Sequence, residues 1–148
     1  MRRVLQLSIL ALVLTAAAVP SHAGGLTGTG LQIGWQTSPD DFLVGFHYQA
    51  RPMGEEFDVV PSLDFGFGDV TMISPNLDAH YVLKSSSKLM PYIGAGISFP
   101  WYDFDGGSEW KFGGAFIGGV HINPNMAFEV KYGWEDVPDW KFVFLLHK

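Results

Sequence analysis

The sequence predicts an all-β protein: an eight-stranded antiparallel up-and-down transmembrane β-barrel preceded by a cleavable signal peptide. Three observations lead to this fold class. Apolar residues recur at every second position along the chain from Gly24 onward, the period of a strand with two different faces. Clusters of Gly, Pro, Asn, Asp and Ser divide this pattern into eight segments. The charged residues inside those segments all share one face. We therefore expect a signal peptide over residues 1–23 and a β-barrel over residues 24–148.

The composition narrows the function classes on its own. The 148 residues include 12 Phe, 5 Trp, 5 Tyr and 18 Gly, while only 16% are charged. A hydrophobic content of 47% excludes intrinsic disorder, because disordered chains lack the apolar residues to bury a core. Nucleic acid is not an expected partner, since the chain has 15 Asp and Glu against 9 Lys and Arg and a phosphate backbone requires a basic face. The absence of cysteine excludes thiolate zinc sites and cysteine nucleophiles.

The first 23 residues have the three parts of a secretory signal peptide. Arg2 and Arg3 give a positive start, residues 4–19 form a nearly uninterrupted apolar run, and Ser21 and Ala23 are the small residues that a signal peptidase recognises. The apolar run is shorter than the ~20 residues that a membrane helix needs. We expect cleavage after Ala23.

The next segments alternate in the manner of strands. Leu31, Ile33 and Trp35 alternate with glutamine and glycine, which predicts a strand over residues 31–36. The second strand is expected over residues 42–49. The third and fourth, over residues 59–68 and 71–83, lie on either side of a tight turn at Gly68 and Asp69.

The second half of the chain repeats this arrangement. A polar turn over residues 84–88 leads into a fifth strand over residues 90–99, and a longer loop follows over residues 100–109. The sixth strand is predicted over residues 110–122, the seventh over 126–134 after an Asn-Pro-Asn turn, and the eighth over 140–147. Eight successive strands joined mostly by short turns form a meander, which can close into a barrel.

Alternation alone does not distinguish a soluble lipocalin-like barrel from a membrane barrel, but the chemistry of the two faces does. The charged strand residues share the parity of most strand glycines, and this set comprises Asp58, Asp64, Asp78, Lys111, Glu129, Lys131 and Lys141. The other face is apolar, with aromatic residues near the strand ends: Trp35, Tyr48, Tyr81, Phe99, Trp110, Tyr132, Trp134 and Trp140. A lysine placed in lipid near the midplane costs roughly 2–4 kcal/mol. We therefore expect the apolar face to contact lipid and the polar face to line a narrow lumen.

Three segments of the second half carry a resemblance to a known family. Residues 91–97, 118–125 and 126–132 resemble the corresponding parts of small outer-membrane barrels of the opacity-protein and outer-membrane-protein-A transmembrane type. The resemblance implies a porin-like barrel in the cell outer membrane of a Gram-negative envelope, with both ends in the periplasm and the longer loops outside. It also implies a monomer that contacts outer-membrane lipid and lipopolysaccharide and uses the barrel-assembly machinery and periplasmic chaperones during biogenesis. Such chains usually end on an aromatic residue, whereas the last aromatic residue here is Phe144.

The predicted lumen collects the groups that could do chemistry. These are His47, Asp64, Asp78, His80, Lys111, His121, Glu129, Lys131 and Lys141. Carboxylate and imidazole pairs could act as acid and base, or the imidazoles could bind a metal. The inward serines Ser62, Ser74 and Ser98 also leave a Ser-His-acid set open. We favour a polar network that plugs the lumen, because charges in a narrow interior require partners. We predict no catalytic residue, metal or cofactor.

The loops at the predicted outer end are acidic. Residues 37–41, 68–69, 100–109 and 135–139 hold nine Asp or Glu and no Lys or Arg. Asp103, Asp105 and Glu109 are the candidate cation ligands, and a solvated rim is the alternative. The expected function is a non-enzymatic structural, adhesion or surface-interaction role. A small channel, a lipid A-modifying barrel enzyme and a soluble periplasmic lipocalin-like carrier remain as alternatives.

Overall fold

The computed structural model describes residues 26–50 and 56–147. The predicted signal peptide over residues 1–23 lies outside these residues. No helix within the described ranges has the length and hydropathy of a membrane span.

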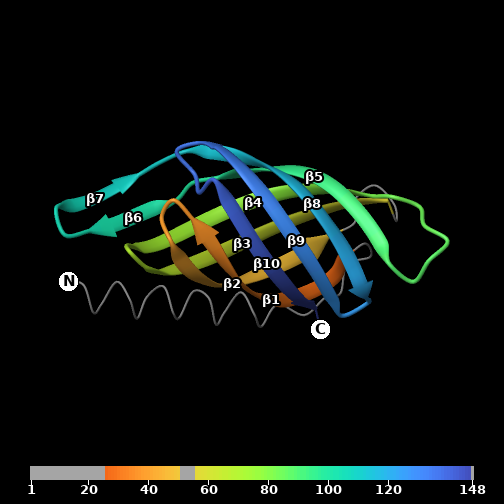
Figure 1. Ribbon diagram of the computed structural model, residues 1–148. Helices are drawn as coiled ribbons and strands as arrows, with labels where there is room; N and C mark the ends of the chain where they lie inside the picture. The colour runs from red at the N-terminus through yellow and green to blue at the C-terminus, as the bar shows by residue number, and fades with distance from the viewer. Residues whose placement is uncertain (1–25, 51–55, 148) are drawn as a thin grey trace.

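Ten strands make up the described fold (Figure 1). Their bounds are β1 (Leu26–Thr37), β2 (Asp41–Ala50), β3 (Phe57–Gly68), β4 (Thr71–Val82), β5 (Met90–Ser98), β6 (Trp101–Phe104), β7 (Gly107–Trp110), β8 (Gly113–Asn123), β9 (Met126–Glu135) and β10 (Trp140–His147). These bounds agree closely with the predicted segments, and the polar turn over residues 84–88 separates β4 from β5 as expected.

The sheet closes on itself. Strands β1 to β5 and β8 to β10 each pair antiparallel with their neighbours, and β1 pairs with β10 to complete the ring. The result is a closed eight-stranded antiparallel barrel, which confirms the predicted fold class. Closure removes the unpaired edges that an open sheet would leave.

The prediction of a long loop over residues 100–109 is wrong in one respect. This segment contains most of a β-hairpin made of β6 and β7. The register along β4 continues without a shift from Asn76↔Ser98 to Ile73↔Trp101, so β6 prolongs β5. Proline has no N–H to donate to a ladder, and Pro100 marks the interruption between the two. Figure 1 shows this hairpin projecting beyond the ends of the other strands.

The predicted sixth strand is likewise interrupted. It divides into β7 and β8 around Lys111 and Phe112, which lie outside both strands. The Lys111 N–H still donates to the Pro100 carbonyl at 2.8 Å, so the backbone pairing passes across the break. We call the end of the barrel that carries this hairpin the hairpin end, and the opposite end, where β1 begins and β10 ends, the terminal end.

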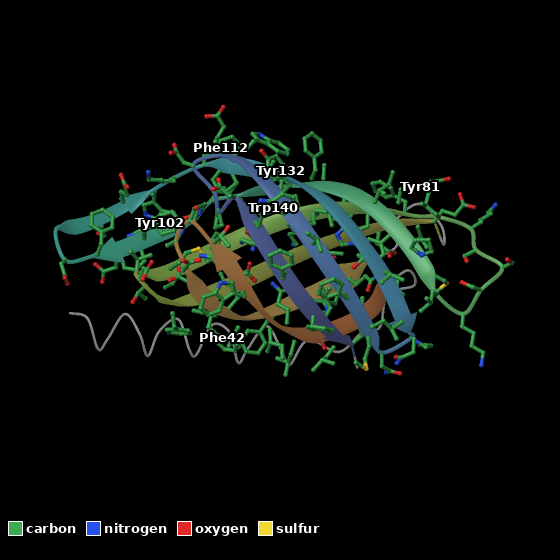
Figure 2. All side chains as sticks on the ribbon, in the orientation of Figure 1. Phe42, Tyr81, Tyr102, Phe112, Tyr132 and Trp140 are labelled. Carbon is green, nitrogen blue, oxygen red and sulfur yellow. The ribbon has the colours of Figure 1, made fainter. Side chains whose placement is uncertain are left out.

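The two faces sort as predicted. Polar residues of the strands are buried inside the barrel, and large apolar residues lie outside, with exposed fractions of 56% at Ile93 and 63% at Phe116. Figure 2 shows Phe42, Tyr81, Tyr132 and Trp140 on the outer surface. A soluble barrel has the opposite distribution, so this surface is one that contacts lipid.

Two small apolar clusters occupy inward positions beside the polar groups. Leu43, Met72 and Tyr102 pack together toward the hairpin end. The second cluster, around Tyr92, consists of Val82, Tyr92, Ile117, Ala127, Val143 and Leu145. The lumen is therefore a packed interior of polar and apolar side chains, in line with the limited space inside eight strands.

Candidate functional site

The centre of the lumen is an ion-pair cluster around Lys131. Residues two apart on a strand share a face, so Glu129 and Lys131 of β9 both point inward, and Asp78 joins them from β4. The Lys131 Nζ lies 2.5 Å from Asp78 Oδ2 and 3.4 Å from Glu129 Oε1. All three side chains are nearly completely buried. Such charges require each other, because an unpaired buried charge is strongly destabilising.

A second cluster is centred on Asp64 of β3. The Lys141 Nζ donates to Asp64 Oδ2 at 3.2 Å, and Asn76 Nδ2 donates to the same oxygen at 3.0 Å. The amide of Gln32 donates to the other carboxylate oxygen. Asp64 is thus held by residues from β1, β4 and β10, and its contacts tie distant strands together across the lumen.

An aromatic and imidazole stack extends the Lys131 cluster. The Tyr92 hydroxyl donates to Glu129 Oε2 at 2.8 Å, and His80 Nε2 lies 3.4 Å from the same oxygen. The His80 ring stacks on Tyr92 with centroids 4.8 Å apart, and the His121 ring lies 4.8 Å from Tyr92 as well. Gly119 leaves the space for this tyrosine, since an added Cβ there would meet the Tyr92 ring.

Tyr92 is a site residue that the sequence reasoning missed. The sequence does contain a signal for it: among the Phe, Trp and Tyr residues of the predicted strands, only Tyr92 lies on the polar face. The other missed residues are two buried amides, Gln36 and Gln49, which donate to carboxylates. Gln36 donates to Asp41 at 3.0 Å, and Gln49 donates to Asp58 at 2.5 Å.

The prediction that Asp41 belongs to the acidic rim is wrong. The sequence pattern assigns it to an outer loop, but it is the first residue of β2 and is fully buried. The Gln36 amide and the Val70 N–H, the latter at 3.5 Å, both face its carboxylate. It therefore belongs to the interior at the hairpin end.

Lys111 lies apart from the other predicted lumen residues. It is in the break between β7 and β8, and its Nζ lies 3.2 Å from Glu109 and 3.4 Å from Asp136. The hydrogen bond to Glu109 and the charge of Asp136 raise the pKa of Lys111 above its ordinary value. The prediction that Lys111 joins the lumen network is wrong, because the strand that was to point it inward is interrupted there.

The remaining predicted lumen residues are all buried inside the barrel. His47, His80 and His121 are buried with Asp64, Asp78, Glu129, Lys131 and Lys141. His47 Nε2 lies 3.0 Å from His147 Nδ1 at the terminal end. The structure thus brings the predicted set together as two ion-pair clusters and a group of histidines.

One group of these residues has the spacing of a metal site. Ligand atoms of Asp78, His80 and Glu129 lie within 4.8 Å of one another. The ammonium of Lys131, however, contacts both carboxylates of this group. The chain itself supplies the cation at this position, and a metal ion would have to displace it.

Little space remains beside these groups. The cavity next to Asp78, Lys131 and Lys141 has a volume of about 10 Å³, close to the least that holds one water molecule. Val137 and Pro138 of the β9–β10 loop also line this cavity and are buried. The central residues of the loop expected to be an acidic rim segment thus lie in the interior of the barrel.

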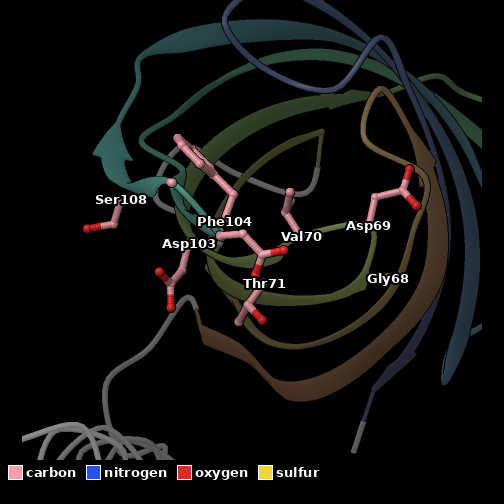
Figure 3. Close-up of a pocket in the computed structure, with 10 residues that line it drawn as sticks. Gly68, Asp69, Val70, Thr71, Asp103, Phe104 and Ser108 are labelled. Atoms are coloured by element: carbon pink, nitrogen blue, oxygen red, sulfur yellow. The ribbon is translucent and has the colours of Figure 1, made fainter.

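The hairpin end carries an open acidic cavity. Asp69, Asp103 and Asp105 line a cavity of about 950 Å³ between the β3–β4 turn and the β6–β7 hairpin. Figure 3 shows Asp69 and Asp103 at the opening of the barrel. Glu109 lies in a separate cavity of about 330 Å³ with Lys111 and Asp136. Of the three predicted cation ligands, Asp103 and Asp105 line the same cavity, whereas Glu109 is paired with Lys111.

The closed ring of eight strands, the apolar exterior and the polar packed interior define a class of protein. They are the features of small transmembrane β-barrels of bacterial outer membranes. A scan against protein-family models finds no match, and a search of curated proteins finds none either.

Among solved structures, the chain is similar to Ail, the attachment invasion locus protein of Yersinia pestis. The structure of Ail in a phospholipid bilayer nanodisc has a TM-score of 0.44 and 15% sequence identity, with 82% of this chain and 96% of that chain covered. The crystal structure of Ail has a TM-score of 0.34 and 17% identity, with 84% and 96% covered. Both scores lie below 0.5, so the class rests on the barrel geometry described above.

Proposed function

We propose that the chain is a monomeric outer-membrane barrel with a non-enzymatic structural, adhesion or surface-interaction role and a closed lumen. The contrast between the two parts of the molecule is the observation that carries this proposal. The interior is filled by mutually paired side chains, whereas the β6–β7 hairpin and its acidic cavity are open to solvent. We therefore assign contact with molecules outside the membrane to the hairpin end.

The packed interior argues against a channel. Conduction requires a continuous water path, but the cavity beside Lys131 and Lys141 has room for about one water molecule. Val137 covers that cavity from the hairpin end, where its side chain is buried. Opening the path would separate ion pairs that stabilise the barrel.

The same packing argues against an enzyme. A general base must reach its substrate, and Glu129 is buried against Tyr92 and Lys131. Ser74 donates to Asn76 at 2.9 Å, and Ser62 accepts from Asn76 at 3.2 Å. These hydroxyls serve the polar network of the lumen.

A soluble lipocalin-like carrier would hold an apolar ligand inside and face water outside. Here the interior holds ion pairs and amides, while the exterior exposes residues such as Ile93 and Phe116. Lipid is the partner that this exterior fits. Lipopolysaccharide, the barrel-assembly machinery and periplasmic chaperones are the further partners that we propose for such a chain.

The acidic cavity indicates the charge of a partner at the hairpin end. Asp69, Asp103 and Asp105 line it together, and like charges around an opening attract cations. Divalent cations shared with lipopolysaccharide phosphates, or a basic surface, have the matching charge. Calcium titration of the detergent-folded chain should release heat that disappears when Asp103 and Asp105 are replaced by Asn. Glu109→Gln is the matched control, since Glu109 is already paired with Lys111. A wild-type titration without heat would leave the solvated rim as the better description.

The main test of the proposed function combines three measurements on the untagged chain expressed in a Gram-negative host. We expect it in the outer-membrane fraction, with different gel mobility before and after boiling, and without conductance steps in planar bilayers. Recovery in the soluble periplasmic fraction would contradict the barrel's placement in the membrane. Conductance steps that change in Lys131 or Glu129 variants would support a channel instead, and release of acyl chains from lipid A that depends on His80 or His121 would support an enzyme.

A further inference from the structure

All four histidines of the predicted barrel region lie in the lumen, and three of them are grouped at the terminal end. His47 is near the end of β2, His121 near the end of β8, and His147 is the last residue of β10. The rings of His47 and His147 have centroids 4.7 Å apart, and those of His121 and His147 are 6.0 Å apart. The two ion-pair clusters described above are centred on Lys131 and Asp64, and His121 contacts the first of them through the Tyr92 ring.

The pairing of the strands explains why two of these rings meet. Gly30 of β1 is the register partner of both His47 on β2 and His147 on β10. A glycine between two histidines leaves the space above its Cα empty, and a Cβ added at Gly30 would collide with the His47 ring. The two imidazoles close over this gap, and His47 Nε2 comes within 3.0 Å of His147 Nδ1.

This nitrogen separation is close to that of two ligands on one metal ion. Imidazole nitrogens bind Zn²⁺ at about 2.0–2.1 Å in tetrahedral geometry, which places two such nitrogens roughly 3.3 Å apart. Small ring rotations would turn both lone pairs toward one ion. The centroid of the His121 ring lies 6.0 Å from that of His147, so His121 would have to move to supply a third imidazole. His147 itself is half-buried at the end of its strand.

The charge of the lumen favours a cation there. Apart from Asp41 at the hairpin end, the buried charged residues of the described chain are four carboxylates and two ammonium groups, namely Asp58, Asp64, Asp78, Glu129, Lys131 and Lys141. A formal excess of negative charge in a low-dielectric interior attracts cations. Nitrogen ligands select among them, because imidazole suits Zn²⁺, Cu²⁺ and Ni²⁺ while Ca²⁺ and Mg²⁺ require oxygen ligands.

We propose that His47 and His147, with His121 as a third ligand, form a binding site for a divalent transition-metal ion at the terminal end of the lumen. In the orientation expected for this barrel, the site faces the periplasm. It is separate from the acidic cavity at the hairpin end and from the Asp78, His80 and Glu129 group, whose cation position Lys131 fills.

The test is isothermal titration of the untagged, detergent-folded chain with Zn²⁺ near neutral pH. An affinity tag of histidines would mask the result, so the chain is isolated without one. We expect one bound Zn²⁺ per chain and no competition by excess Ca²⁺ or Mg²⁺. His147→Gln should weaken Zn²⁺ binding at least tenfold, and His47→Gln should do the same.

His80→Gln is the matched control, because His80 is a lumen histidine that is buried like His47 but belongs to the Lys131 cluster. Zn²⁺ affinity should be unchanged in this variant. Gel mobility before and after boiling verifies that each variant is folded. If His47→Gln fails to fold, His147→Gln at the half-buried strand end still decides the question.

Two results would overturn the proposal. One is a wild-type chain that binds no Zn²⁺, in which case the two imidazoles only share a hydrogen bond. The other is binding that is lost in His80→Gln and kept in His147→Gln, which would place the ion at Asp78 and Glu129 instead. Both results are independent of whether the hairpin end binds a partner.

Discussion

The lumen and the hairpin end are both rich in acidic residues, but their carboxylates stand in different surroundings. In the lumen, Asp64, Asp78 and Glu129 are buried and have fixed cationic partners. At the hairpin end, Asp103 and Asp105 line an open cavity. The same side-chain chemistry therefore stabilises the barrel in one region and is free to meet other molecules in the other. Whether a carboxylate stabilises the barrel or can bind another molecule therefore depends on where it lies, and not on whether it is Asp or Glu.

The largest effect is expected at the centre of the lumen. Lys131→Met keeps most of the side-chain volume and removes the ammonium, which leaves Asp78 and Glu129 buried without their cation. Breaking a buried ion pair in this way costs about 3–5 kcal/mol. Urea unfolding of the detergent-folded chain, followed by tryptophan fluorescence, measures the loss. Adding Asp78→Asn and Glu129→Gln to the same chain should restore part of the stability. An unchanged unfolding midpoint in Lys131→Met would show that the buried carboxylates of the lumen do not depend on their cationic partner.

A smaller effect is expected from the tyrosine beside this cluster. Tyr92→Phe removes the hydroxyl that donates to Glu129 at 2.8 Å and keeps the ring between His80 and His121. Hydrogen bonds to charged groups contribute about 1.5–3 kcal/mol, so the same urea unfolding should show a loss of that size. Outward-facing Tyr132→Phe is the control, since Tyr132 lies on the exposed face. Equal losses in both variants would show that the hydroxyl at Glu129 has no special role.

The hairpin end should respond differently to the loss of a lysine. Lys111→Met removes the contacts with Glu109 and Asp136, but both carboxylates are exposed and regain water. Surface ion pairs contribute little to stability, so we expect no measurable shift in the unfolding midpoint. A loss comparable to that of Lys131→Met would mean that the rim network, too, holds the barrel together.

The smallest effect concerns an exposed ion pair at the terminal end. Lys84 lies 2.7 Å from Glu56, and hydrogen bonds from Lys84 and Tyr81 lower the pKa of Glu56 below its ordinary value. A lowered folded-state pKa contributes stability at pH values above the unfolded pKa, and this contribution is lost as the pH falls through the folded pKa. Nuclear magnetic resonance titration of Glu56 should show its pKa rising toward the ordinary value in Lys84→Ala. Because an exposed ion pair contributes little to stability, the stability lost at neutral pH should be too small to measure by unfolding. An unchanged Glu56 pKa would show that the pair is not formed in solution.

The strand pattern could be predicted from the sequence because the period of two is a local property. Side chains two apart share a face, so parity alone is enough to assign Asp64, Glu129 and Lys131 to the lumen. The partners within the lumen depend on the register between distant strands. No spacing along the chain indicates that Lys131 contacts Asp78, or that Gly30 lies between His47 and His147.

The differences at the hairpin end have local physical causes as well. Asp41 follows a turn, and its polarity suggested a solvated rim, but strand β2 begins at Asp41 and points it inward to Gln36. Pro100 and the glycines at 106 and 107 indicated a loop. The register inherited from β5 nevertheless continues through Pro100 into β6. A prediction from sequence considers only the proline and glycines that interrupt a strand. In the folded chain, β4 also offers hydrogen-bonding partners that allow the pairing to continue beyond them.

That continued register has an entropic consequence for binding. A flexible ten-residue loop loses backbone freedom when it meets a partner, at a cost of about 1–2 kcal/mol for each residue that becomes fixed. The β6–β7 hairpin has already lost that freedom during folding, because Trp101 to Phe104 are paired with Gly107 to Trp110 and β6 is anchored on β4. Association at its tip is therefore preorganised, and a modest contact area would suffice there where a mobile loop would need a larger one.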